Sequence, residues 1–205
     1  MQLASSLVNV ILNRSLFIYG GDLAIGAMGI INSITTIIFM PIFGINQGSQ
    51  PVIGFNYGAK LYDRVKNALK LAIIAATVIS TLGALCAYIF PYVLVGLFNK
   101  NDVNLTNITV NGIKIFMAMF PILGFQIVSS NFFQAIARAK ISIFLSLSRQ
   151  VIVLIPMLLM LPRIFGLNGV WLAAPVSDGI SSVLTAIFLF LEIKKLKTPG
   201  MSNLM

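Results

Sequence analysis

The sequence of 205 residues contains no histidine, one cysteine and only five acidic residues. Without histidine, the protein lacks the commonest general base and the commonest metal ligand. The single cysteine, Cys86, excludes an internal disulfide and a thiolate metal cluster, and its apolar neighbours are typical of a small buried hydrophobe. Because so few groups can transfer protons or bind metals, we expect no enzyme, no cofactor and no metal site.

Charged residues of either sign are also scarce. They make up 9% of the chain, whereas 58% of its residues are hydrophobic. A soluble domain carries about 25% charged residues, because its surface faces water. The natural solvent of this chain is therefore a lipid bilayer, in which every backbone amide must be paired inside a helix. The composition predicts an all-α membrane protein.

Apolar segments near the ~20 residues that cross a bilayer recur six times along the chain. They are separated by turns expected at 20–22, 48–59, 99–111 and 162–169, which are rich in glycine, proline or polar residues. We predict one six-helix lobe over residues 1–193, followed by a basic cytoplasmic tail over 194–205. The expected spans are 2–19, 23–45, 68–98, 113–135, 141–161 and 169–191.

The net charge of +9 comes from basic residues in the short gaps between apolar runs, which is typical of membrane topology and not of nucleic-acid binding. Arg149 falls inside the fifth span. The more basic side holds Lys60, Arg64, Lys66, Lys70, Arg138, Lys140, Lys194, Lys195 and Lys197, and the other holds Arg14, Lys100, Lys114 and Arg163. This bias predicts that the first side, with both chain ends, is cytoplasmic.

Two further features concern organisation. Met1 opens directly into an apolar run, so we expect the chain to begin partway along a helix. A weak internal repeat relates residues 39–44 to residues 119–124, and both regions are followed by an Ala-Lys pair, at Lys60 and Lys140. Transporter folds commonly contain such repeats.

Polar side chains inside spans have a cost unless they find a partner or face water. Amides and hydroxyls recur at helical spacing in the first span, and amides alternate with Met and Phe in the second. They either form hydrogen bonds between helices or line a water-accessible cavity for amphipathic ligands. We predict a substrate cavity lined by Asn9, Asn13, Asn32, Thr36, Met40, Phe43 and Gln47, and Gln2 shares the stripe of the first span.

Asp178 is the one carboxylate deep within a predicted span. It follows Gly169 by nine residues, and Arg149 follows Lys140 by nine, so each lies about 13 Å from its own side of a core of about 30 Å. An isolated charge at that depth is costly, so we predict that the two residues pair. The pair is either a structural link or a protonatable ion-coupling site.

The run from Pro41 to Lys60, PIFGINQGSQPVIGFNYGAK, is followed by Arg64 and Lys66 and resembles the signature of the multidrug and toxic compound extrusion (MATE) family. Residues 27–30 and 169–175 also resemble that family, nearest to its MepA-like branch. The resemblance covers essentially the whole chain, and the six spans match the seventh to twelfth helices of the family.

This resemblance implies one of two six-helix lobes that enclose a cavity and export cationic or amphipathic drugs in exchange for Na⁺ or H⁺. It implies a bacterial inner-membrane protein linked to antibiotic resistance, whose partners are the bilayer, the drugs and a missing N-terminal lobe or a second copy. Several family members carry acids in the seventh and tenth helices. Here the first span offers amides and hydroxyls, and Gln126 stands in the fourth where an acid would be sought, so we include Gln126 in the cavity.

Two alternatives stay open. A flippase of lipid-linked saccharides would need several basic residues in the spans to hold a pyrophosphate, whereas only Arg149 is deep. A truncated lobe without function of its own is the other alternative.

Overall fold

The computed structural model describes residues 2–99 and 102–196, with side chains from Ala4 onward. Throughout these residues the regular structure is helical, which confirms the all-α prediction. The elements are α1 (Gln2–Gly58), α2 (Tyr62–Ile89), α3 (Pro91–Gly96), α4 (Val103–Phe116), α5 (Phe120–Ala135), α6 (Ala139–Leu147), the π-helical turn η1 (Ser148–Val153), α7 (Leu154–Phe165) and α8 (Leu167–Lys195).

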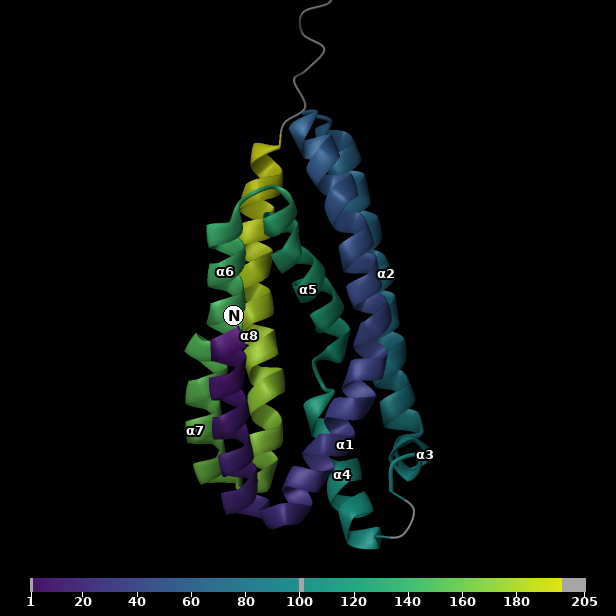
Figure 1. Cartoon of the computed structure of the whole chain (residues 1–205), viewed down its shortest axis with the longest axis vertical. Coiled ribbons are helices and arrows are strands. Elements are labelled where there is room, and N and C mark those ends of the chain that lie inside the picture. The colour runs from purple at the N-terminus through teal and green to yellow at the C-terminus, as the bar shows by residue number, and fades with distance from the viewer. Residues whose placement is uncertain (1, 100–101, 197–205) are drawn as a thin grey trace, which may run out of the picture.

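Helix α1 consists of two segments that reverse direction at Gly21, as Figure 1 shows at the lower end of the bundle. Gly21 has φ 65° and ψ −161°, a conformation that residues with a Cβ rarely adopt. The preceding Gly20 is needed for close packing, because a Cβ there would lie 2.6 Å from the Cβ of Ala24 and 2.9 Å from Leu167. The expected turn at 20–22 thus divides α1 into segments 2–20 and 22–58.

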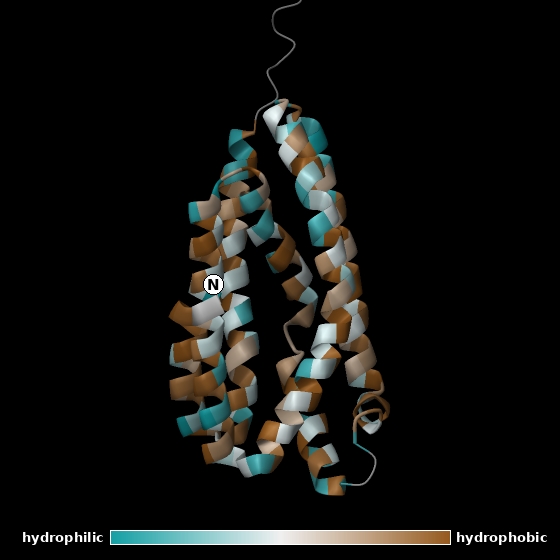
Figure 2. Ribbon diagram, in the orientation of Figure 1, coloured by the Kyte–Doolittle hydropathy of each residue, from teal (hydrophilic) through white to brown (hydrophobic). Residues whose placement is uncertain are grey.

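Within the described residues, four helices are long and apolar enough to cross a bilayer, and the pair α4–α5, bent by 55°, gives a fifth. One of the four is α1, which is counted once although it has two segments. Counted by segments, the chain therefore runs along the bundle six times, in agreement with the expected six-helix lobe. Figure 2 shows apolar residues along most of the helix length.

Two expected breaks are wrong in detail. The glycine-, proline- and asparagine-rich stretch 48–59 is helical as far as Gly58, and polar side chains in it bond to carbonyls of their own helix. Asn56 Nδ2, for example, donates to the Val52 carbonyl at 2.7 Å. The expected loop 99–111 is helical from Val103, because Asp102 caps α4 by accepting from the Leu105 amide at 3.0 Å.

Two runs along the bundle are interrupted by irregular turns. The fourth bends between α4 and α5, just before Pro121, and the fifth widens at η1, just before Pro156. Proline cannot donate a helical hydrogen bond, and its ring displaces the carbonyl four residues earlier. The sixth run, α8, extends to Lys195, so the first two residues of the expected tail are helical, and residues 197–205 lie outside the described part.

The corners after α1 and after α5 have the same backbone structure. Lys60 has φ 59° and Ala137 has φ 60°, and each lies at the end of a helix. In both corners, the amide that follows donates to a carbonyl five residues earlier, which is the Schellman arrangement. These bonds are Leu61 N to Asn56 O at 2.9 Å and Arg138 N to Phe133 O at 2.7 Å. The repeat in the sequence pairs Lys60 with Lys140, 80 residues later, whereas the two corners are 77 residues apart, so the corners are alike without matching the register of that repeat.

The core has two apolar clusters, one near each end of the bundle. The first gathers around Trp171 and Phe120, and the second around Phe132 and Phe133. Helix α5 packs on α2 so closely that a Cβ at Gly124 would clash with the backbone of Ala76. Between the clusters, about halfway along the bundle, the charged side chains of η1 and α8 come together.

Candidate functional site

Arg149 is fixed at the wide turn η1. Turns of this type accommodate one extra residue and occur frequently at functional sites. The hydroxyl of Ser177, on α8, donates to the Arg149 carbonyl at 2.7 Å. The same carbonyl also accepts from the Leu154 amide, so the Ser177 bond is an additional one that holds η1 against α8.

The Arg149 side chain reaches the carboxylate next along α8. Its Nε donates to Asp178 Oδ1 at 2.7 Å. The Asp178 side chain is 7% exposed and that of Arg149 is 31% exposed. The structure therefore brings the two residues of the expected pair together, with the acid covered and the guanidinium partly open.

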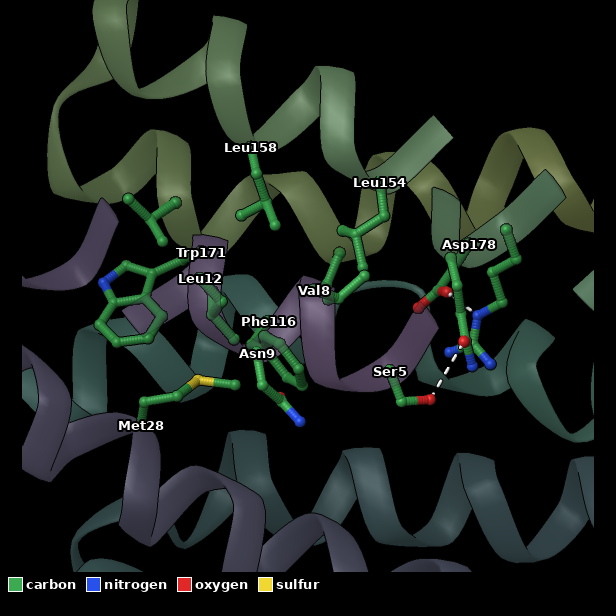
Figure 3. Close-up of a pocket in the computed structure, with 14 residues that line it drawn as sticks. Ser5, Val8, Asn9, Leu12, Met28, Phe116, Leu154, Leu158, Trp171 and Asp178 are labelled. Atoms are coloured by element: carbon green, nitrogen blue, oxygen red, sulfur yellow. Dashed lines mark hydrogen bonds and ion pairs between the residues drawn. The ribbon is translucent and has the colours of Figure 1, made fainter. Parts of the chain in front are cut away.

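A cavity of about 250 Å³ lies on one side of this pair (Figure 3). Its polar lining comes from Ser5 and Asn9 on α1, Arg149 and Gln150 on η1, and Asp178 on α8. Apolar side chains line most of the remainder, and Trp171, Leu154 and Leu158 are among those labelled in Figure 3. The cavity thus combines largely apolar walls with a charged end at Asp178, and the amide of Asn9 lies among the apolar walls, next to Phe116 (Figure 3).

A second cavity, of about 300 Å³, lies on the other side of η1. It is lined by Phe39 and Phe43 of α1 and by Gln126 and Asn131 of α5, among others. Both cavities share Arg149 and Gln150. These two adjacent residues therefore form the boundary between them.

Gln150 was not among the residues expected from the sequence. Its Oε1 accepts a hydrogen bond from the Ser5 hydroxyl at 3.2 Å, which links η1 to the first segment of α1. Regular α-helical spacing puts Gln150 on a different face from Ser142, Ser146 and Arg149. The π-helical turn η1 departs from regular α-helical spacing. In the sequence, the one sign of an irregular helix in this region is the proline at position 156.

The expected cavity residues are distributed over three places. Asn9 lines the first cavity, and Phe43 and Gln126 line the second. Gln126 is 2% exposed, and its Oε1 has no hydrogen-bond partner among the described residues. The remaining five lie on exposed surface of α1 and line neither cavity: Asn13, Asn32, Thr36, Met40 and Gln47. The side chain of Gln2 lies outside the described part.

The exposed residues of the second segment of α1 form one face. Their spacing of three and four residues puts Asn32, Thr36, Met40, Phe43 and Gln47 on a single side of the helix. The Thr36 hydroxyl donates to the Asn32 carbonyl at 2.8 Å, so this polar group is satisfied within the helix. Met40 is 64% exposed and Phe43 is 48% exposed. We call this set the α1 face.

A second ion pair, also missed from the sequence, joins the α5–α6 corner to the end of α8. Arg138 Nε lies 3.1 Å from Glu192 Oε1, and the side chains are 40% and 4% exposed. Arg138 was counted only as a loop charge. The sequence feature that could have predicted this pair is the spacing of 14 residues between Asp178 and Glu192. It puts both acids on nearly the same face of α8.

The face of α8 between the two acids carries buried hydroxyls. Ser181, Ser182 and Thr185 are each at most 5% exposed, and their oxygens have no partner among the described residues. No group of three or more His, Cys, Asp or Glu side chains suited to a metal occurs in the described residues.

Comparison with known proteins relates the whole bundle to drug transporters. The multidrug export protein MepA of Staphylococcus saprophyticus is 23% identical over 192 residues, covering 93% of this chain and 42% of MepA. The solved structure of a MATE multidrug transporter, DinF-BH, is 36% identical with a TM-score of 0.82, covering 96% of this chain and 44% of that one.

An outward-facing multidrug resistance MATE family transporter of the MOP superfamily has a TM-score of 0.87 at 20% identity, covering 95% of this chain and 44% of that one. The chain thus spans less than half the length of each of these relatives. The MatE family model matches residues 1–159, which is well over half of the sequence. The chain belongs to the MatE family of membrane transporters.

Proposed function

We propose that the chain is the C-terminal six-helix lobe of a multidrug exporter that works as a secondary antiporter. It takes cationic or amphipathic drugs from the cell and exchanges them for Na⁺ or H⁺. The observation that carries the proposal is the pair of cavities that meet at Arg149, halfway along the bundle and next to apolar and aromatic walls. Transporters commonly bind substrate at this depth, at the interface between repeats.

A matching first lobe would cover the α1 face. Asn32, Thr36 and Gln47 are exposed there together with Met40 and Phe43, and unpaired amides in hydrocarbon are costly. The relatives are more than twice as long as the stretch they share with this chain. A second copy of the chain is the alternative occupant of this face.

We propose a bacterial cell membrane as the location, with both termini cytoplasmic. The Lys60 and Arg138 corners and the end of α8, with Lys194 and Lys195, lie at the same end of the bundle (Figure 1). Their basic residues favour the cytoplasmic side. In a Cys86→Ser background, Asn67→Cys should react with thiol reagents from the cytoplasm and Asn104→Cys from outside. Both positions are exposed, and the opposite labelling pattern would reverse the orientation.

The coupling ion would be Na⁺ or H⁺, and the Arg149–Asp178 pair is either the coupling site or a structural link. The flippase alternative is less well supported by the cavities. Of the described residues that line either of them, Arg149 alone is basic, whereas a pyrophosphate calls for several basic residues.

Drug susceptibility of an efflux-deficient bacterial host tests the proposal. The chain alone should give no resistance and should accumulate poorly, and co-expression with a matching first lobe should restore both. Collapse of the Na⁺ gradient and of the proton gradient, each in turn, would identify the coupling ion. Ion-dependent resistance from the 205 residues by themselves would replace the two-lobe proposal with a functional homodimer.

A further inference from the structure

The guanidinium of Arg149 is only partly used by its ion pair. Its Nε donates to Asp178, and neither of its terminal nitrogens has a hydrogen-bond partner among the described residues. Arginine has five N–H donors in a planar fork, so four remain. The exposed fractions, 31% for Arg149 and 7% for Asp178, mean that the open end of the pair is its positive end.

Both cavities meet this positive end. Arg149 lines the two of them, while Asp178 lines only the first, and no other charged residue in the described part of the chain lines either. The neighbouring Gln150 adds to the same character, because its Oε1 already accepts from Ser5, which leaves its amide N–H groups as the available end. The unused hydrogen-bonding groups at the boundary are therefore mainly donors.

These donors discriminate between ligands of opposite charge. An organic cation at Asp178 has to share a carboxylate that already accepts from the Arg149 guanidinium at 2.7 Å and meets the repulsion of that guanidinium, whereas an anion can add to the free fork and leave that bond intact. Carboxylate and sulfonate oxygens match the fork geometry of arginine, and such charge-assisted bonds are strong in a partly desolvated site.

The first cavity also provides an apolar wall for the body of such a ligand. Leu154 and Leu158 of α7 lie along it, and Trp171 lies near its far end in Figure 3. Asp178, which accepts a hydrogen bond from Arg149, and Trp171 lie on opposite sides of the same chamber (Figure 3). This arrangement suits an elongated amphipathic molecule better than a compact ion.

We propose that this lobe binds amphipathic organic anions with one carboxylate or sulfonate group, held by Arg149 and Gln150, with the apolar body toward Trp171. The proposal rests on the proposed transport function and narrows its substrate class to anions among the amphipathic drugs. In this proposal Asp178 has a structural role and is not the coupling site. A coupling cation bound to the Asp178 carboxylate would release Arg149 and strengthen anion binding. Antiport requires the opposite, because the entering cation has to weaken substrate binding.

Two probes with the same aromatic body test the charge preference. The 205-residue chain in nanodiscs of neutral phosphatidylcholine is titrated with 1-naphthylacetate and with 1-naphthylmethylammonium, and binding is followed by calorimetry. Neutral lipid is chosen because anionic lipid would concentrate the cation. We expect naphthylacetate to bind at least about tenfold more tightly, which is about 1.4 kcal/mol.

Variants of Arg149 and Asp178 test whether these residues cause the preference for the anionic probe. Arg149→Gln combined with Asp178→Asn removes both charges without leaving either one buried alone, and it should abolish the preference while the helical circular dichroism is retained. Arg149→Lys should keep part of it, and Asp178→Asn alone should tighten naphthylacetate binding. Arg163→Gln is the matched control, because Arg163 is an exposed arginine on α7 that lines neither cavity.

Each other outcome overturns the inference. Equal binding of the two probes, or preference for the ammonium, would overturn the anionic substrate class and leave the exporter proposal to the resistance assay. A preference that survives in the doubly neutral variant would place the anion elsewhere. If the folded chain bound neither probe, this cavity would not be a ligand site, although the two-lobe exporter would still be tested by resistance.

Discussion

Two ion pairs join α8 to the region around α6, and they differ in where their arginines lie. In both, the acid is buried, at 7% exposure for Asp178 and 4% for Glu192, and the arginine is more open. The acids are 14 residues apart, or about 21 Å along the helix axis. Arg149 opens into cavities within the bundle, whereas Arg138 lies at a corner, next to Ala137 with its positive φ.

The comparison shows how depth changes the meaning of the same chemistry. An arginine at the end of a bundle can turn toward water or lipid headgroups when its acid is lost. An arginine halfway along the bundle can reach water only through the cavity. The end pair can therefore lose its acid, Glu192, at little cost in stability. In the deep pair, loss of either partner alone is costly, so the two residues must be kept or removed together.

The largest effect is expected when the deep pair is broken from one side. Arg149→Gln leaves the Asp178 carboxylate buried without a partner, which should lower the free energy of unfolding by about 3–5 kcal/mol. Combining it with Asp178→Asn should restore much of this loss. Thermal unfolding of purified protein for the full double-mutant cycle measures the coupling, and additive effects would contradict a direct pair.

The end pair should respond asymmetrically. Arg138→Gln leaves Glu192 buried and should cost about 2–3 kcal/mol, whereas Glu192→Gln leaves a 40% exposed arginine that can reach water and should cost less than about 1 kcal/mol. Unfolding of the two single variants under identical conditions checks the ratio. Equal losses would mean that Arg138 is as confined as Arg149.

Loss of the hydroxyl that holds η1 should have a smaller, local effect. The Ser177 hydroxyl donates to the Arg149 carbonyl at 2.7 Å, and Ser177→Ala leaves that carbonyl without this donor, at a cost of about 1 kcal/mol. It should also speed hydrogen exchange at η1 relative to α2. Ser33→Ala is the control, because the Ser33 hydroxyl bonds within its own helix and lies on exposed surface. Equal exchange at η1 in wild type and Ser177→Ala would exclude this anchoring.

The fold could be predicted from the sequence because its signal is long and repeated. Apolar runs and glycine turns predicted the six runs along the bundle, and matched depths predicted that Arg149 and Asp178 meet. The ends of helices were predicted less well. Gly58 ends α1 far beyond residue 45, because glycine, proline and asparagine are weak signals for a helix end, and here polar side chains such as Asn56 bond within the helix.

The site was predicted only in part, because its geometry depends on irregular backbone. Gln150 follows Arg149 within η1 and lines the same two cavities, although it does not share the expected polar stripe of Ser142, Ser146 and Arg149. Asn9, Phe43 and Gln126 line cavities. Whether the α1 face lines a shared cavity depends on a second lobe, and no pattern within one lobe contains that information.

The smallest effect is expected between the two pairs, at the hydroxyl of Thr185. This residue is fully buried, and its Oγ1 has no partner among the described residues. Thr185→Val keeps the shape and removes an unsatisfied polar group, so it should leave stability unchanged or raise it by a few tenths of a kcal/mol. Thermal unfolding of Thr185→Val, measured in parallel with Ser177→Ala, compares the loss of an unpaired hydroxyl with the loss of a paired hydroxyl on the same helix. A loss of about 1 kcal/mol or more would instead mean that Thr185 bonds to buried water, and that the region between the two ion pairs is hydrated.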